Sequence, residues 1–237
     1  MVLDGGGPLL IALHGLGETR SLDAGARGWK EDYLLGLAHS RLRKAPLHTK
    51  AYRGLVSEAR LSAINDDLKA HPYRGLTVVC PFTPNLMAGW TSEAKAYARF
   101  LIDELVPAVS ERLGHDFSAT PIGIDGVSLG GRVAWLVGLT HPDTFTTVGA
   151  LQPAFRASEI HRLIKLARTA QDATSAARPL RLVTSTRDHF RLTIEALSGR
   201  LKRADLRHTL LYTDGPHDYI WNQGPGAIEM LFWHDRH

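Results

Sequence analysis

The sequence alternates between short apolar runs, typical of β-strands, and longer segments in which apolar residues recur at helical spacing. The strand-like runs lie at residues 9–13, 76–80, 122–126, 146–151, 180–185 and 208–213. The helical patterns lie at residues 30–42, 58–70, 93–113, 132–140, 159–170, 191–201 and 226–233. Alternation of this kind predicts an α/β fold with a mostly parallel sheet of about six strands and helices on both faces.

The chain has 237 residues, enough to bury a sizeable core in one domain, and no low-complexity linker divides it. We therefore predict a single domain over residues 1–237. The first two strand-like runs are separated by more chain than one crossover helix needs. Residues 18–75 are accordingly expected to form a cap, an insertion or a partner surface.

Composition is that of an ordinary globular protein, with 44% hydrophobic and 22% charged residues. The net charge of +4 comes from dispersed basic residues, so we expect no nucleic-acid partner. The single cysteine, Cys80, fits a reducing compartment. No apolar stretch approaches the roughly 18 residues that span a bilayer, and no secretory signal is recognisable. We predict a soluble, cytoplasmic chain without a membrane span, unless a longer precursor has been trimmed.

The third strand-like run ends abruptly in a Gly-x-Ser-x-Gly pattern, with Ser128 between Gly126 and Gly130, and the chain then continues into an apolar helical face. A serine hydroxyl is a poor nucleophile unless a tight strand-to-helix turn exposes it to a base and to amide donors. Such a turn needs neighbours without bulk, which the two glycines supply. The pattern predicts a nucleophile elbow; the alternative is a glycine-rich turn with an idle serine.

Polar residues follow the predicted ends of several strands. Ser128, Asp188 and His217 occur in this order, each just beyond a strand-like run. In an open parallel sheet, functional residues gather at the carboxyl ends of the strands. The order serine, acid, histidine is that of an α/β-hydrolase triad. We therefore predict Ser128 as the nucleophile, Asp188 as the orienting acid and His217 as the base.

Other residues compete for two of these roles. His14 adjoins the loop after the first strand-like run, and we interpret it as a structural ligand of that loop, with the role of base as the alternative. Asp214 is more typical of a turn residue. Asp218 is adjacent to His217, and neighbouring side chains diverge. Asp188 itself has an alternative role as the surface ion-pair partner of Arg187.

An oxyanion hole requires two backbone N–H donors. We predict those of Leu16, between two glycines, and of Leu129, directly after the serine. Trp90 and Trp221 are candidates for the wall of a substrate pocket, with burial in the core as the alternative. No His-x-x-x-His or Cys-x-x-Cys pair and no nucleotide-binding glycine motif occurs. We predict no metal and no cofactor.

Two segments resemble a known family. Residues 124–131, together with the following His-Pro-Asp-Thr-Phe at 141–145, look like the elbow and helix of the putative-esterase (esterase D-like) branch of the α/β hydrolases. Residues 215–221, Gly-Pro-His-Asp-Tyr-Ile-Trp, are similar to that branch's histidine motif. The resemblance implies an α/β-hydrolase fold. Members of the branch normally carry extra strands before the first strand found here, so the sheet is expected to be minimal or the chain to be a fragment.

The leading hypothesis is a serine esterase that cleaves a small-molecule carboxylic ester or thioester through an acyl-enzyme intermediate. Two alternatives stay open at this point. One is an acyltransferase that uses the same three residues, and the other is a non-catalytic binding protein with the hydrolase fold. The sequence leaves the oligomeric state and the identity of the ester undetermined.

Overall fold

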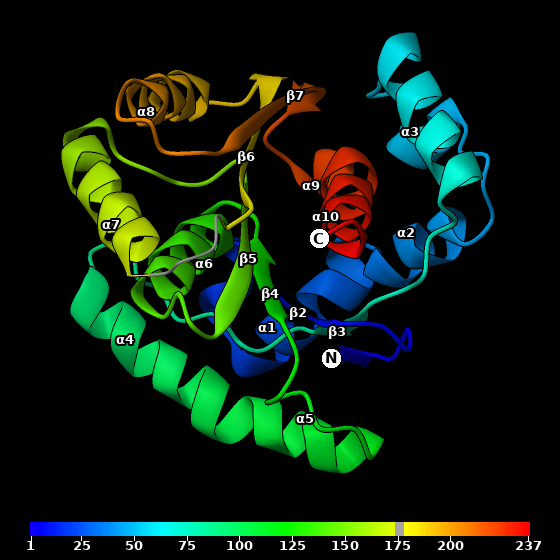
Figure 1. Cartoon of the computed structure of the whole chain (residues 1–237). Coiled ribbons are helices and arrows are strands. Elements are labelled where there is room, and N and C mark those ends of the chain that lie inside the picture. The colour runs from blue at the N-terminus through cyan, green and yellow to red at the C-terminus, as the bar shows by residue number, and fades with distance from the viewer. Residues whose placement is uncertain (174–177) are drawn as a thin grey trace.

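The computed structural model describes residues 1–173 and 178–237, and in this part of the chain a seven-stranded sheet carries helices on both faces (Figure 1). The order of the strands is β1-β3-β2-β4-β5-β6-β7. They are β1 (Val2–Leu3), β2 (Leu9–Leu13), β3 (Thr77–Val79), β4 (Ile122–Gly126), β5 (Phe145–Leu151), β6 (Leu180–Arg187) and β7 (Thr209–Pro216). All neighbours pair in parallel except β1, which runs antiparallel to β3.

The strand that the sequence did not predict is β1. It has two residues, Val2 and Leu3, which pair with Val79 and Val78. Two residues are too few to produce a recognisable alternation, so the predicted sheet of about six strands becomes one of seven. The other six strands match the predicted runs to within a few residues. The mostly parallel α/β architecture is therefore confirmed.

Ten α-helices lie in the described residues. They are α1 (Leu22–Arg27), α2 (Leu35–Leu42), α3 (Glu58–Ala70), α4 (Thr91–Arg99), α5 (Val106–Leu113), α6 (Leu129–Thr140), α7 (Ile160–Asp172), α8 (Arg191–Arg203), α9 (Tyr219–Trp221) and α10 (Ala227–Asp235). The helix predicted over residues 30–42 is divided in two: Gly28–Asp32 is π-helical, and α2 begins at Leu35, after Leu34 with a left-handed backbone of φ 53°.

Helices α4 and α5 are joined by a wider, π-helical segment over Phe100–Leu105. Pro107 lies at the start of α5, where a helix tolerates proline. The chain remains helical through the proline. The N–H of Val106 donates to the carbonyl of Leu101, which gives the wider turn directly before Pro107.

The two faces of the sheet bury alternate residues of each strand. In β2, the side chains of Leu9, Ile11 and Leu13 belong to the core that contains α4 to α8. Leu10 and Ala12 belong to the opposite core, which contains α2, α3 and α10. Most apolar residues of the 18–75 segment lie in this second core, and Figure 1 shows α2 and α3 beside α10. This segment thus builds a helical layer on one face of the sheet.

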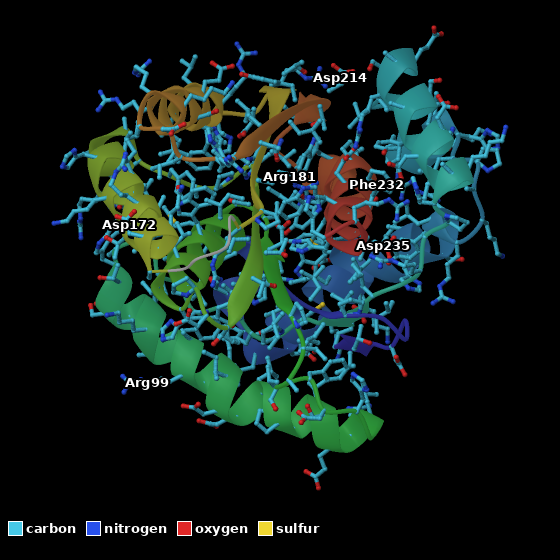
Figure 2. The ribbon with its side chains drawn as sticks, in the orientation of Figure 1. Arg99, Asp172, Arg181, Asp214, Phe232 and Asp235 are labelled. Carbon is cyan, nitrogen blue, oxygen red and sulfur yellow. The ribbon has the colours of Figure 1, made fainter. Side chains whose placement is uncertain are left out.

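Buried charges connect this layer to the sheet. The carboxylate of Glu229 in α10 accepts hydrogen bonds from Arg60 of α3, at 2.9 and 2.5 Å, and from the hydroxyl of Tyr52. Arg181 of β6 donates to the backbone carbonyl of Glu229 and lies 3.4 Å from Asp125 of β4. Figure 2 shows Arg181 between the sheet and α10. Arg181 thus links α10 to β4, the strand that leads into Ser128.

No helix in the described ranges is long and apolar enough to cross a membrane.

Candidate active site

Ser128 lies on a strained turn between β4 and α6. Its backbone has φ of 57° and ψ of −115°, a combination that is rare for a residue with a side chain. The turn is held on both sides, because the N–H of Ser128 donates to Leu151 at 2.9 Å and its carbonyl accepts from Arg132 and Ala154. The N–H of Val127 donates to Leu13. This geometry places the half-buried serine at the carboxyl edge of the sheet, as a nucleophile elbow does.

The two glycines of the pattern are required for space. A Cβ added to Gly126 would lie 2.5 Å from the carbonyl carbon of Gly130, and one added to Gly130 would lie 2.3 Å from the carbonyl oxygen of Leu13. Both contacts are with backbone atoms, which cannot give way without moving β2 or α6. The glycines thus allow the turn to lie directly against the end of β2.

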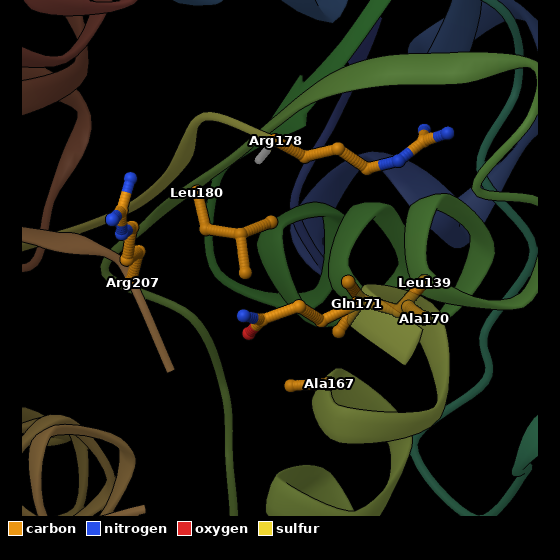
Figure 3. Close-up of a pocket in the computed structure, with 7 residues that line it drawn as sticks. All are labelled: Leu139, Ala167, Ala170, Gln171, Arg178, Leu180 and Arg207. Carbon is orange, nitrogen blue, oxygen red and sulfur yellow. The ribbon is translucent and has the colours of Figure 1, made fainter. Parts of the chain in front are cut away.

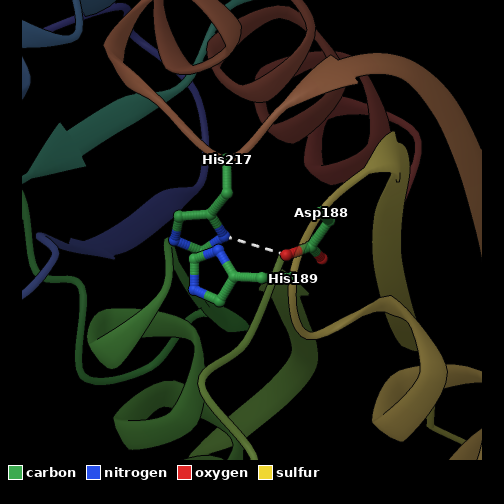
Figure 4. A group of neighbouring side chains, drawn as sticks. All are labelled: Asp188, His189 and His217. Atoms are coloured by element: carbon green, nitrogen blue, oxygen red, sulfur yellow. Dashed lines mark hydrogen bonds and ion pairs between the residues drawn. The ribbon is translucent and has the colours of Figure 1, made fainter.

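His217 and Asp188 form a hydrogen-bonded pair (Figure 4). Nδ1 of His217 lies 3.0 Å from Oδ1 of Asp188. Asp188 follows the end of β6, and His217 follows the end of the neighbouring strand β7. Parallel pairing of the two strands places both residues at the same edge of the sheet. The predicted acid and base are therefore in contact.

The surroundings of Asp188 determine which ring nitrogen carries the proton. The carboxylate is buried and also accepts hydrogen bonds from the hydroxyl of Thr184 at 2.8 Å and from the N–H of Phe190 at 3.0 Å. An ionised carboxylate only accepts hydrogen bonds, so Nδ1 of His217 must be the donor. The lone pair of the imidazole then lies on Nε2, where a base needs it.

Two residues that the sequence did not single out pack against the imidazole of His217. The ring of His189 lies 4.3 Å from that of His217, centroid to centroid, and the ring of Phe190 lies at 5.4 Å. Burial, and secondarily the charge of His217, lowers the pKa of His189 below its usual value. His189 is therefore mostly neutral at neutral pH and adds little repulsion to an imidazolium at His217.

Asp188, His189 and His217 also offer donor atoms within 4.8 Å of one another, a grouping that could hold a metal ion. Both oxygens of Asp188 and Nδ1 of His217 already make hydrogen bonds within the protein. These atoms are thus already used to hold the carboxylate and the imidazole together.

Ser128 and His217 line the same hollow at the carboxyl edge of the sheet. The other residues that line it are Gly15, Leu16, Gly17, Glu18, Tyr33, Val127, Asp218, Tyr219 and Asn222. A Cβ added to Gly15 would lie 3.8 Å from that of Ser128, so the loop after β2 is directly beside the serine. The structure therefore brings together the predicted nucleophile, the predicted base and the loop that carries Leu16.

The two predicted amide donors are placed differently. Leu129 is the first residue of α6, so its N–H has no partner within the helix. The N–H of Leu16 makes no hydrogen bond to any of the described residues, whereas that of the preceding Gly15 donates to the hydroxyl of Tyr33 at 3.0 Å. The amides of Leu16 and Leu129 thus lie in segments that flank Ser128.

The rival residues lie in other environments. His14 is fully buried, where its Nε2 accepts from the N–H of Thr83 at 2.8 Å and its Nδ1 lies 2.9 Å from the carbonyl of Gly15. This matches a structural ligand of the loop. Asp214 is exposed near the end of β7 (Figure 2). Asp218 accepts from the N–H of Trp221 and caps α9.

Neither predicted tryptophan lines the hollow beside Ser128. Trp221 is fully buried, and its indole N–H donates to the hydroxyl of Thr213 at 2.8 Å. Trp90 precedes α4, and its ring contacts the guanidinium of Arg162 at 3.8 Å. Trp221 therefore belongs to the core beneath the turn that carries His217, the alternative that the sequence left open. The assignment of Trp90 to a pocket wall stays a prediction.

A second hollow lies at the opposite end of the strands. Figure 3 shows the side chains around it, which are Leu139, Ala167, Ala170, Gln171, Arg178, Leu180 and Arg207. Leu180 begins β6, whereas Asp188 follows the end of the same strand. This second hollow is therefore remote from the Asp188–His217 pair.

Comparison with known proteins assigns the chain to a family. A family model described as putative esterase matches residues 83–222, more than half of the sequence. The chain belongs to the putative-esterase family. Its matched segment includes Ser128, Asp188 and His217. No curated protein sequence matches this putative esterase significantly.

Solved structures resemble this putative esterase in fold. A ferulic acid esterase is 17% identical, with a TM-score of 0.62 over 97% of this chain and 85% of the other. The S-formylglutathione hydrolase FrmB of Staphylococcus aureus is 15% identical, with a TM-score of 0.57 and coverages of 96% and 80%. The enterobactin esterase FES of Shigella flexneri is 14% identical, with a TM-score of 0.61 and coverages of 99% and 53%. These likenesses show the α/β-hydrolase fold.

Proposed function

We propose that the protein is a serine esterase in which Ser128 is the nucleophile, His217 the general base and Asp188 the orienting acid. Its substrate is a small-molecule carboxylic ester or thioester. Oγ of Ser128 attacks the acyl carbon while Nε2 of His217 takes the hydroxyl proton. The protonated imidazole then gives this proton to the leaving alcohol or thiol, and an acyl-enzyme remains.

Water completes the reaction by the same steps in reverse. His217 removes a proton from the water, which attacks the acyl carbon, and the proton returns to Oγ of Ser128 as the acid product leaves. Asp188 keeps the proton of the neutral ring on Nδ1 and stabilises the imidazolium when it forms. The carboxylate does not itself take the proton.

The N–H groups of Leu16 and Leu129 are proposed as the oxyanion hole. Negative charge develops on the acyl oxygen in both tetrahedral intermediates, and preorganised amide donors stabilise it without reorganisation. Leu129 presents its N–H at the start of α6, where the positive end of the helix dipole adds to the effect. The second proposed donor is the N–H of Leu16, in the loop after β2 that lines the same hollow.

One observation carries the proposal: Ser128 and His217 line one hollow with Leu16, and Nδ1 of the same histidine is hydrogen-bonded to Asp188 at 3.0 Å. The strained backbone of Ser128 supports it, because strain of this kind persists where a function requires it. Membership of the putative-esterase family supports the reaction class.

The test is hydrolysis of p-nitrophenyl esters of increasing acyl length by the wild type and by Ser128→Ala. We expect the wild type to hydrolyse at least one ester, and the variant to lose at least about a thousandfold in turnover. The variant should unfold at nearly the wild-type temperature, because removal of one half-buried hydroxyl loses little packing. Residual turnover within about tenfold of the wild type would exclude Ser128 as the nucleophile.

Two further measurements separate the alternatives. A fluorophosphonate probe should label the wild type at Ser128, whereas a non-catalytic binding protein would remain unlabelled. Addition of an alcohol to the ester assay distinguishes hydrolysis from acyl transfer. An esterase gives mainly the free acid, and a new ester as the dominant product would favour the acyltransferase.

A further inference from the structure

A buried carboxylate lies next to the proposed oxyanion donor. Glu18 belongs to the short 3₁₀ helix Gly17–Arg20, which begins directly after Leu16, and it is 1% exposed. It lines the hollow with Ser128, although none of the proposed catalytic steps uses it. A buried negative charge near a developing oxyanion would oppose the reaction unless hydrogen bonds stabilise it.

Two phenol hydroxyls hold this carboxylate. Tyr33 donates to Oε2 of Glu18, and Tyr219 donates to Oε1 at 2.7 Å. The rings of the two tyrosines lie 5.9 Å apart, so the carboxylate is bound from two neighbouring side chains. Tyr33 comes from the segment before α2, and Tyr219 is the first residue of α9. Three distant parts of the sequence thus meet at Glu18.

Tyr33 also determines which amide of the loop is available. Its hydroxyl accepts the N–H of Gly15 at 3.0 Å while it donates its own proton to Glu18. The N–H of Gly15 is therefore engaged, whereas that of Leu16 makes no hydrogen bond to any residue in ranges 1–173 and 178–237. Loss of the Tyr33–Glu18 contact would leave the hydroxyl free to turn and would release Gly15.

The glycines of the loop approach both hydroxyls closely. A Cβ added to Gly15 would lie 3.0 Å from the hydroxyl of Tyr33, and one added to Gly17 would lie 2.8 Å from that of Tyr219. The backbone on each side of Leu16 thus rests against one end of the Tyr33–Glu18–Tyr219 bridge. The position of the Leu16 amide follows from these two contacts.

The bridge also reaches the base. Tyr219 lies two positions after His217, at the start of α9. Through Tyr219, the carboxylate of Glu18 joins the loop that carries the oxyanion donor to the turn that carries the histidine. The catalytic steps require both groups at fixed distances from the same acyl carbon, and displacement by about 1 Å can cost about a hundredfold in rate.

We propose that Glu18 is a positioning residue, which fixes the Leu16 amide relative to His217 through hydrogen bonds to Tyr33 and Tyr219. This role rests on the proposed function, because it concerns the geometry of that site. Glu18 takes no proton and touches no reacting atom. It is expected to affect turnover and to leave substrate affinity unchanged.

The test compares Glu18→Gln with Tyr219→Phe in the ester assay. Glutamine keeps the shape but removes the charge, and its N–H₂ group cannot accept a hydrogen bond, so one of the two phenols loses its acceptor. We expect kcat to fall about 10- to 100-fold in Glu18→Gln and about tenfold in Tyr219→Phe, with KM within about twofold of the wild type. Tyr212→Phe is the matched control, because Tyr212 is an exposed tyrosine beside Glu195 on the surface. Its kcat should equal that of the wild type.

A double variant separates positioning from a loss of folding. Glu18→Gln with Tyr219→Phe should be no slower than the worse single variant, because both changes break the same bridge. All variants are compared at equal folded fraction. An unchanged kcat in folded Glu18→Gln would overturn the proposal, and so would a raised KM with kcat unchanged, since Glu18 would then contact the substrate.

A second readout does not depend on activity. The hydrogen bond to Glu18 is the main cause that raises the pKa of Tyr219 to about 12. Titration of the tyrosines by ultraviolet absorbance should show one phenol returning toward its ordinary pKa in Glu18→Gln. If the wild type hydrolyses no ester, the proposed function fails while this titration still tests the bridge. A titration identical to that of the wild type would show that no bridge exists.

Discussion

Oδ1 of Asp188 lies 3.0 Å from Nδ1 of His217, across a sequence separation of 29 residues. The contact exists because β6 and β7 pair in parallel as far as Arg187 and Pro216, which brings the residues directly after the two strands together. The second carboxylate oxygen is engaged by the hydroxyl of Thr184 at 2.8 Å. Each oxygen of Asp188 thus has its own partner. The carboxylate is held in one orientation, and it in turn orients the imidazole of His217.

Replacement of Asp188 by asparagine should reduce turnover and leave substrate binding nearly unchanged. The amide cannot stabilise an imidazolium, and its N–H₂ group can favour the wrong tautomer of His217. A loss in kcat of up to about 10⁴ is expected, with KM within about twofold of the wild type. Steady-state kinetics on a p-nitrophenyl ester measure both constants.

The matched controls are Asp214→Asn and Asp218→Asn. Asp214 is exposed, and Asp218 caps α9 through the N–H of Trp221 at 2.9 Å. Neither change should lower kcat by more than about tenfold at equal folded fraction, since Asp214 is remote from the imidazole and asparagine caps a helix about as well as aspartate. A strongly reduced kcat in Asp214→Asn, together with a nearly unchanged kcat in Asp188→Asn, would refute the assignment of Asp188 as the acid.

Replacement of Gly130 by alanine should destabilise the protein and reduce activity together. The new Cβ would lie 2.3 Å from the carbonyl oxygen of Leu13 and 2.6 Å from that of His14, and both contacts are with backbone. We expect a loss of about 1 to 3 kcal/mol in the free energy of unfolding. Urea denaturation followed by circular dichroism measures it.

Gly199→Ala is the control for that substitution. Gly199 lies inside α8, and the nearest atom to an added Cβ is a side-chain nitrogen of Arg203 at 3.8 Å. Alanine is the better helix former, so this variant should gain about 0.5 to 1 kcal/mol with unchanged activity. Equal destabilisation of both variants would mean that the space around Gly130 is not the cause.

The ion pair of Arg132 and Glu159 should behave as a buried pair. Arg132 is fully buried, and its two terminal nitrogens donate to Glu159 at 2.5 and 2.8 Å. Arg132→Met leaves the carboxylate without its charge partner and should cost about 3 to 5 kcal/mol in unfolding free energy. The double variant Arg132→Met with Glu159→Leu should recover much of this loss. Denaturant titrations of all three proteins test the prediction, and equal losses in the single and double variants would contradict it.

Stability should fall as the pH is lowered below about 6.5. Burial lowers the pKa of His14 in the folded protein, against the weaker opposite effects of Gly15 and Glu18. In the unfolded chain the histidine has a pKa of about 6.5. Below that pH the unfolded chain binds a proton at this histidine, whereas the folded protein does not. The stabilisation is complete above about pH 6.5 and is lost as the pH falls toward the lower, folded value.

Thermal unfolding between about pH 7.5 and 5.5 measures this loss, which can reach about 1.4 kcal/mol per pH unit for each proton. His14→Gln should show a shallower dependence, because the amide can accept from Thr83 and donate to Gly15 without titrating. His234 is buried and its pKa is lowered in the same direction, so part of the slope should remain. A steeper slope in the variant would contradict the prediction.

Much of the sheet could be predicted because its signals are local. The run that became β2 is buried on both faces, so it is continuously apolar and easily recognised. The elbow and the order of Ser128, Asp188 and His217 follow from the same pattern, since each residue lies just after a strand. β1 was missed because two residues carry no periodicity.

The residues around the proposed triad could not be predicted, because their contacts are not local. Glu18 accepts hydrogen bonds from Tyr33, which is 15 positions away in the sequence, and from Tyr219, which is 201 positions away. Nothing in the local sequence signals these contacts. Trp221 is a related case. The sequence left both a pocket wall and the core open for it, and only the fold reveals that its indole N–H donates to Thr213.

The pairing of Glu229 with Arg60 has a consequence for how the chain reaches its native state. The two residues are 169 positions apart, and the hydroxyl of Tyr52 reaches the same carboxylate across 177. During synthesis, residues 18–75 leave the ribosome long before α10 exists. Their apolar side chains, such as Trp29 and Ile64, then remain exposed to solvent, because α10 completes the core that buries them. Until α10 has been synthesised, a nascent chain of this topology can aggregate or bind chaperones through these side chains.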